Sequence, residues 1–205
     1  MPVNLESKEY PWFPPETWIG GSWRTAPSRK TVTNPATGEV LAEVAQGDEA
    51  VLNEAIECAH QAFLHWRNVS SQTRGAILKK TAALLTERRS EFATLLTLEQ
   101  GKAIRQAEAE VDYAASFYEW FGEEARRLHT IVTDHPSDGR EFFIEKKPVG
   151  VVGIITPWNF PLAQGAKKVA AALAAGCAFV WKPAELTPLV ALAMGPLLKE
   201  AGLPD

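Results

Sequence analysis

The alternation of apolar and polar segments is clearest in the carboxyl-terminal part of the chain. A β-branched apolar run at 149–155, interrupted only by glycines, predicts a parallel strand buried on both faces. After a proline-rich break at 156–161, an alanine-rich segment of helical pattern ends at Gly176, where a left-handed cap is expected. A second apolar run at 177–181 follows, and the threonine–proline pair at 187–188 has the form of a helix start. The pattern predicts a strand–helix–strand unit followed by another helix.

The preceding part of the chain predicts a small antiparallel sheet and a layer of helices. Strand-like runs at 17–23 and 30–44 are separated by turn signals. Asp48 and Ser70 (or Ser71) are placed to cap two amphipathic helices, on the second of which Arg74, Lys79 and Lys80 are expected in solvent. A third helix is predicted from Ser90 to Gly101, and a long helical stretch covers 102–128. The aromatic residues of this stretch could line a substrate entrance, but core packing is the favoured interpretation: Tyr113, Phe117, Tyr118, Trp120 and Phe121.

Residues 130–147 differ in character from the helices before them. Two strand-like apolar runs flank Asp138 and Gly139, a pair that is typical of a hairpin turn. A two-stranded ribbon alone is marginally stable in water, so this one needs a surface to pack on. That surface is either another subunit or the rest of its own chain.

Composition and charge exclude several classes of protein. The 205 residues are 46% apolar, which is ample for a globular core, and the net charge of −4 is mixed along the chain. Neither a nucleic-acid partner nor a membrane surface is expected from this balance. The longest nearly apolar run is too short to span a bilayer, and no signal pattern opens the chain, which predicts a cytoplasmic protein. Two cysteines and four scattered histidines indicate neither a disulfide framework nor a metal site.

Candidate chemistry lies at the carboxyl ends of the two predicted parallel strands, where ligands of such units bind. Glu185 can accept hydrogen bonds from ribose hydroxyls and would repel a 2′-phosphate, which favours NAD over NADP. Lys182 can donate to the same ribose or neutralise phosphate, and the amide of Asn159 can stabilise an oxyanion. From spacing alone, a solvated lysine and a turn-forming asparagine explain these positions equally well. The chain has no G-x-G-x-x-G fingerprint to decide the matter.

Several separated motifs, in order and at matching spacing, give the chain a resemblance to the aldehyde dehydrogenase superfamily. The motifs are PWNFP at 157–161, ALAAGC at 172–177, KPAE-x-TP at 182–188, IGG at 19–21, NPATG at 34–38, EQGK at 99–102 and EWFGEEARR at 119–127. The last two are most similar to the succinate-semialdehyde dehydrogenase branch. The resemblance implies a truncated α/β fold. Residues 1–129 would form strands and a helical layer, 130–147 an oligomerisation hairpin, and 148–205 the first βαβα units of a Rossmann-like NAD-binding sheet.

The resemblance also assigns roles to individual residues. Asn159 corresponds to the oxyanion donor, and Lys182 and Glu185 to the residues that hold the adenosine ribose of NAD. Further cofactor contacts are implied for the residues that link the first strand to Asn159: Ile155, Thr156, Pro157 and Trp158. The implied partners are a small-molecule aldehyde and further copies of the chain, in a dimer or tetramer.

Substrate choice depends on the helix after PWNFP. The succinate-semialdehyde branch has an arginine there that pairs with the substrate carboxylate, and this chain has Lys167. Lysine keeps the charge but loses the bidentate fork, so succinate semialdehyde is a preference rather than a conclusion. Gln164 and Trp181 also depart from the usual aliphatic residues. Trp181 either crowds the adenosine pocket or fills a gap left by small neighbours.

The resemblance implies covalent catalysis by a thiolate, followed by hydrolysis of a thioester. The nucleophilic cysteine, the water-activating glutamate and the glycine-containing phosphate turn would follow residue 205 in a family member. Cys177 matches the structural cysteine of the family's AAGC motif, which is buried at a strand start, whereas reactive thiols occupy exposed, electropositive sites. We therefore expect the 205-residue chain by itself to be inactive. The alternative is a non-catalytic short product that acts through subunit association.

Overall fold

The computed structural model describes residues 15–134, 136 and 139–205. The expected amino-terminal arm, residues 1–15, lies outside this part except for its last residue. The predicted small sheet is observed as two antiparallel pairs, β1 (Thr17–Ile19) with β2 (Ser22–Arg24) and β3 (Ser28–Thr33) with β4 (Val40–Gln46).

Four α-helices form the predicted helical layer: α1 (Glu49–Trp66), α2 (Ser71–Glu87), α3 (Arg89–Gln100) and α4 (Ile104–Glu124), the last followed by a short 3-10 turn, η1 (Ala125–Arg127). The predicted caps of the first two helices are confirmed, because Asp48 accepts a hydrogen bond from an amide of the first turn of α1 at 3.0 Å and Ser70 does so for α2 at 3.1 Å. The cap predicted at Thr187 is wrong, because its side chain donates to or accepts from no amide of the helix that follows. Gly101 ends α3 at φ 84°, a left-handed conformation that suits glycine.

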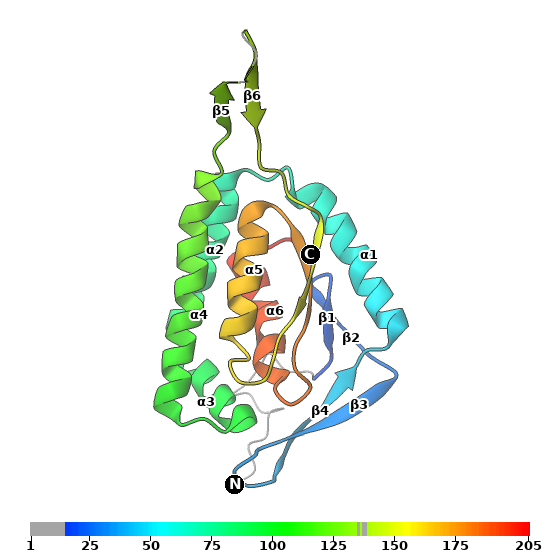
Figure 1. Ribbon diagram of the computed structural model, residues 1–205. Coiled ribbons are helices and arrows are strands. Elements are labelled where there is room, and N and C mark those ends of the chain that lie inside the picture. The colour runs from blue at the N-terminus through cyan, green and yellow to red at the C-terminus, as the bar shows by residue number, and fades with distance from the viewer. Residues whose placement is uncertain (1–14, 135, 137–138) are drawn as a thin grey trace.

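The carboxyl-terminal part is the predicted strand–helix–strand unit with a further helix: β7 (Val151–Ile155), α5 (Ala163–Ala175), β8 (Ala178–Lys182) and α6 (Leu189–Ala201). The two strands are parallel and pair in register from Val151 with Ala178 to Ile155 with Lys182. Helix α5 lies between these strands and α4, at the centre of the molecule (Figure 1).

The prediction that the first parallel strand is buried on both faces is wrong. Ile154 is 2% exposed, whereas Ile155 is 76% exposed. Among the described residues β7 pairs only with β8, and the side that carries Ile155 is open. The apolar run correctly indicated a parallel strand, but hydrophobicity alone does not show which of its faces is covered.

The prediction that Arg74 is solvated is also wrong. Its side chain is buried, and the guanidinium donates to the carbonyls of Ala174 at 3.1 Å and Val69 at 2.5 Å. Arg74 thus satisfies a carbonyl at the carboxyl end of α5, where a cation is favoured. Its position on α2 gives no sign of this partner, which lies 100 residues further along the chain.

Helices α2 and α4 cross closely because glycines stand at the crossing. A Cβ added to Gly75 would lie 2.6 Å from the carbonyl oxygen of Gly122. The helical layer and α5 share one apolar core, in which the largest fully buried side chains include Leu78, Leu85, Phe92, Leu96, Tyr118 and Val169. The aromatic stripe is therefore divided, with Tyr118 in the core and Tyr113 and Trp120 exposed.

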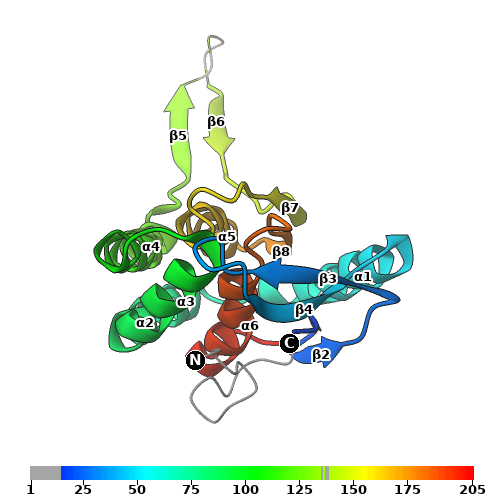
Figure 2. The ribbon, with the colours of Figure 1, turned by 90° about the horizontal axis from the view of Figure 1, so that it is seen from below.

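The hairpin of β5 (Ile131–Asp134) and β6 (Glu141–Ile144) is antiparallel, as predicted, and projects from the body of the molecule in both views (Figure 1 and Figure 2). Residues 137 and 138 of the predicted turn lie outside the described part. All residues of the two strands are exposed, so the hairpin does not fold back on its own chain. Of the helices in the described residues, none is long and apolar enough to cross a membrane.

Candidate cofactor and oxyanion site

The carboxyl ends of β7 and β8 meet at one edge of the parallel pair, as the sequence predicts. The amide of Thr156 donates to the carbonyl of Lys182 at 3.3 Å, and the indole N–H of Trp181 donates to the Thr156 hydroxyl at 2.9 Å. The two segments that carry the candidate residues are thereby fixed side by side. Thr156 is buried, whereas Ile155, Pro157, Trp158 and Asn159 are exposed.

Trp181 fills the gap left by a small neighbour. Its ring packs so tightly on Gly165 of α5 that a Cβ added to that glycine would collide with it. The indole is partly buried, and its polar N–H has a partner in Thr156. Of the two interpretations of Trp181, packing against small residues is the one that the contacts support.

Glu185 is held by two lysines. One carboxylate oxygen lies 2.5 Å from Nζ of Lys30, on β3, and the other lies 3.8 Å from Nζ of Lys182. The hydrogen bond and charge of Lys30, with the charge of Lys182, keep the pKa of Glu185 below its ordinary value. The side chain is nearly half exposed. An ionised, accessible carboxylate at this edge can accept hydrogen bonds from a diol.

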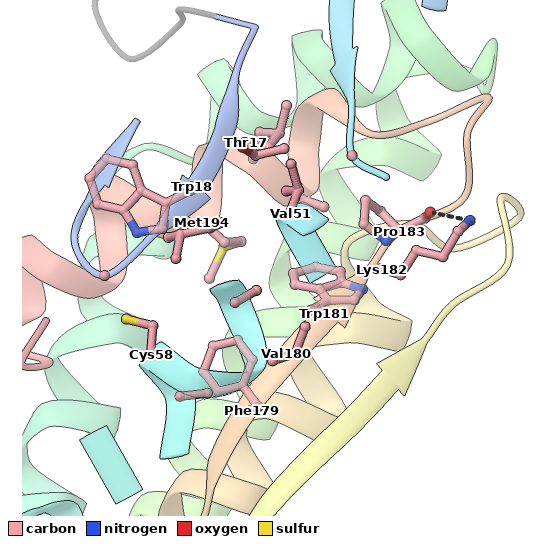
Figure 3. Close-up of a pocket in the computed structure, with 18 of the residues that line it drawn as sticks. Thr17, Trp18, Val51, Cys58, Phe179, Val180, Trp181, Lys182, Pro183 and Met194 are labelled. Atoms are coloured by element: carbon pink, nitrogen blue, oxygen red, sulfur yellow. Dashed lines mark hydrogen bonds between the residues drawn. The ribbon is translucent and has the colours of Figure 1, made fainter. Parts of the chain in front are cut away.

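Beside β8 lies a cavity of about 770 Å³. Figure 3 shows its walls: Phe179, Val180 and Trp181 from β8, Trp18 from β1, Val51 and Cys58 from α1, and Met194 from α6, with Lys182 and Pro183 at one end. The lining is mostly apolar, and it includes the ion-paired residues Lys30, Lys182 and Glu185, an arrangement that offers both an apolar surface and polar groups to a ligand. The residues present therefore fit the adenosine portion of a dinucleotide.

A second cavity, of about 550 Å³, lies against Asn159. Its other lining residues come from the end of α3, the link between α3 and α4, α4 itself and the loop before α5: Gln100, Lys102, Gln106, Ala109, Glu110, Tyr113 and Phe160. Tyr113 also contacts Phe117, with ring centroids 4.5 Å apart. Nζ of the exposed Lys167 lies 5.7 Å from the Phe117 ring. Asn159 thus shares this cavity with Tyr113, and the Phe117 ring that contacts Tyr113 lies beside Lys167.

Two buried glutamates were not identified from the sequence. One carboxylate oxygen of Glu110 accepts hydrogen bonds from the backbone amides of Leu162 and Ala163, at 3.0 and 3.1 Å. The carboxylate of Glu99 accepts those of Leu189 and Val190 at 2.7 and 3.0 Å. Each glutamate therefore caps one helix of the α/β unit, α5 or α6, from the helical layer.

Burial raises the pKa of Glu99 to about 8, although the hydrogen bonds from the backbone amides of Leu189 and Val190 act to lower it. The sequence feature that could have identified Glu99 and Glu110 is an acidic residue on the inward face of a helix. Glu99 is also the first residue of the EQGK motif. Part of that motif is therefore structural, because Glu99 fixes the start of α6.

Comparison with known proteins places the chain in a family. Residues 23–205 match the model of the aldehyde dehydrogenase family, and the chain belongs to that family. It is 45% identical over 188 residues to the mitochondrial succinate-semialdehyde dehydrogenase of Arabidopsis thaliana, covering 91% of this chain and 36% of the relative. It is 46% identical over 194 residues to succinate-semialdehyde dehydrogenase [NADP(+)] 1 of Schizosaccharomyces pombe, covering 94% and 39%.

The fold agrees with this assignment. The crystal structure of succinate-semialdehyde dehydrogenase from Burkholderia pseudomallei superposes with a TM-score of 0.93 at 42% identity, covering 98% of this chain and 42% of that one. The predicted family, branch and fold class are confirmed. The chain spans well under half the length of these relatives.

Proposed function

We propose that this chain supplies the nucleotide-holding edge and the oxyanion donor of an enzyme that oxidises an aldehyde to a carboxylate with NAD. The observation that carries the proposal is that the segments following β7 and β8 are joined at one edge of the parallel pair, where the amide of Thr156 donates to the carbonyl of Lys182. Family membership supports an oxidoreductase and disfavours the non-catalytic association module. NAD, when bound, accepts a hydride from the substrate.

The roles follow from the positions of the side chains. Glu185, which pairs with Lys30, accepts hydrogen bonds from the ribose hydroxyls, and Lys182 donates to the same ribose. Residues 155–158, at and just after the end of β7, would border the cofactor, with Ile155, Pro157 and Trp158 exposed and Thr156 buried beneath them. Asn159 donates its amide N–H to the oxyanion that forms when a nucleophile adds to the aldehyde. Cys177 is 3% exposed at the start of β8, which agrees with a structural cysteine rather than that nucleophile.

NAD is favoured over NADP because the Glu185 carboxylate would repel a 2′-phosphate. The S. pombe relative is named for NADP(+), so the NAD preference proposed for this chain is not shared by every relative. Succinate semialdehyde is the proposed substrate, with Lys167 as the group that pairs with its carboxylate beside Phe117. A cytoplasmic location remains a prediction, and the A. thaliana relative is named as mitochondrial.

The projecting hairpin is proposed to join subunits in a dimer or tetramer. Its large apolar side chains are between 47% and 70% exposed: Ile131, Val132, Phe142, Phe143 and Ile144. Residues 1–129, 130–147 and 148–205 would then be, in turn, the helical part, the association ribbon and the start of the nucleotide-binding sheet. A ribbon that leaves this much apolar surface in water gains by packing on a second copy.

The test pairs intact mass with turnover. The protein is purified from its native source, and its intact mass is measured by mass spectrometry. The same sample is assayed for NADH formation from NAD with succinate semialdehyde. A mass well above that of 205 residues, with aldehyde-dependent NADH formation, supports the proposal. A mass equal to that of this chain, without turnover, would overturn the proposal of a dehydrogenase and favour the alternative of a non-catalytic association module.

A further inference from the structure

The ion pair between Lys102 and Glu110 is the most deeply buried salt bridge among the described residues. The Glu110 side chain is 0% exposed and that of Lys102 is 8% exposed. Removing two charges from water is costly unless further hydrogen bonds satisfy them. Where those additional bonds go therefore indicates what the pair does.

Both partners direct their remaining hydrogen bonds to residues 159–163. Nζ of Lys102 donates to the backbone carbonyl of Asn159 at 3.2 Å and lies 4.5 Å from the centroid of the Phe160 ring. Glu110 accepts the two amides at the start of α5 at 3.0 and 3.1 Å. The pair thus holds the segment at the Asn159 carbonyl and again at the amides that follow it.

We propose that Lys102 and Glu110 are positioning residues, which fix the backbone of 159–163 so that the Asn159 amide points at the developing oxyanion. This inference rests on the oxyanion role proposed above for Asn159. An oxyanion donor acts through preorganisation, so it must be held in place before charge develops. Asn159 is exposed on a loop, and the orientation of its side chain therefore depends on how firmly its backbone is fixed.

The variants separate positioning from general stability. Lys102→Met removes the donor to Asn159 but also leaves Glu110 buried without a counter-charge, which destabilises the whole fold. The double variant Lys102→Met/Glu110→Gln removes both charges, and the glutamine oxygen can still accept the amides of α5. The matched control is Lys79→Met, which breaks the exposed ion pair of Lys79 with Glu123 between α2 and α4.

The first readout is amide hydrogen exchange of this chain, followed by mass spectrometry. In the double variant we expect the amides of Leu162 and Ala163 to exchange at least about tenfold faster, because a neutral glutamine oxygen holds them more weakly than the carboxylate does and the bond from Lys102 is lost, while amides of α2 keep their rates. Lys79→Met should leave both regions unchanged. Exchange of the Leu162 and Ala163 amides within about twofold of the wild type in the double variant, or an equal acceleration by Lys79→Met, would overturn the proposal.

The second readout is steady-state kinetics of the native, turnover-competent protein. The double variant should lower kcat by about tenfold or more and leave the KM for NAD unchanged, because Lys182 and Glu185 are not disturbed. If the wild-type protein oxidises no aldehyde, the proposed function fails while the exchange experiment still decides whether the pair holds the segment. Faster exchange together with an unchanged kcat would refute the positioning role alone.

Discussion

Lys30 and Glu185 are 155 positions apart in the chain, yet their charged groups lie 2.5 Å apart at the carboxyl end of β8. The contact joins the antiparallel pair β3–β4 to the nucleotide edge of the parallel unit. It also lowers the pKa of the Glu185 carboxyl, because the hydrogen bond and charge of the lysine stabilise the ionised form. The small amino-terminal sheet therefore takes part in preparing the candidate cofactor site.

Replacing Glu185 should change the choice of cofactor. In the native protein, Glu185→Gln is expected to weaken NAD binding by about tenfold and to narrow the preference for NAD over NADP, because the repulsion of a 2′-phosphate is lost. Titration calorimetry with both nucleotides measures this. Glu57→Gln, an exposed glutamate on α1, is the matched control and should leave both affinities unchanged. An unaltered NAD-to-NADP ratio in Glu185→Gln would contradict the assignment.

Glu99 should make the fold less stable as the pH rises. Its pKa is about 8 in the folded chain against an ordinary value of 4.5, so between these values the folded protein keeps a proton that the unfolded chain has lost. The free energy of unfolding contributed by this group is fully present below pH 4.5, falls across that window by up to about 5 kcal/mol, and is lost above pH 8.

Urea unfolding at a series of pH values measures this dependence. Glu99→Gln cannot titrate, so the difference in stability between it and the wild type should change across pH 4.5–8 and stay constant outside it. A constant difference throughout the series would show that the carboxylate is already ionised on the two amides of α6.

The crossing of α2 and α4 should not tolerate a methyl group. Gly75→Ala is expected to lower the free energy of unfolding by roughly 1–3 kcal/mol, because the new Cβ would lie 2.6 Å from the Gly122 carbonyl oxygen. Gly153→Ala is the control, since no atom stands within 4 Å of its added Cβ, and its effect should stay within about 0.5 kcal/mol. Equal effects in thermal unfolding would argue against close packing at the crossing.

Replacing Lys167 should change the KM only for aldehydes that carry a carboxylate. Lys167→Met is expected to raise the KM of the native protein for succinate semialdehyde by about tenfold, whereas Lys167→Arg should maintain or lower it because the guanidinium forms a bidentate pair. Butanal has the same carbon number without the charge, and its KM should not change in either variant. A parallel loss for both aldehydes would mean that Lys167 supports the fold rather than binding the carboxylate.

The hairpin should control the association state. Phe143 is 70% exposed, and Phe143→Asp is expected to shift the native protein to a smaller species in sedimentation velocity, because a charge at the subunit contact is desolvated. Ile104→Asp changes another exposed apolar residue, at the start of α4, and should leave the oligomer intact. A sedimentation coefficient of Phe143→Asp equal to that of the wild type would exclude the hairpin as the contact.

The local elements could be predicted from the sequence because their causes are local. The side chains of Asp48 and Ser70 reach amides only three residues away, and Gly101 and Gly176 take the left-handed conformation that glycine tolerates best. The parallel strands and the shared edge at their carboxyl ends, where Thr156 contacts Lys182, followed from the order of the elements. The candidate residues at this edge could be predicted for the same reason.

Only the tertiary structure decided how the buried charges are used. Arg74, Glu99 and Glu110 lie on helices that the sequence predicts correctly, but their partners are the ends of α5 and α6, between 52 and 100 residues away. A charged residue in a helical pattern is normally solvated, and it becomes a cap only when packing brings a helix end to it. The exposure of one face of β7 was likewise decided by the tertiary structure. Burial depends on which elements cover a strand, and the strand's own side chains do not specify that.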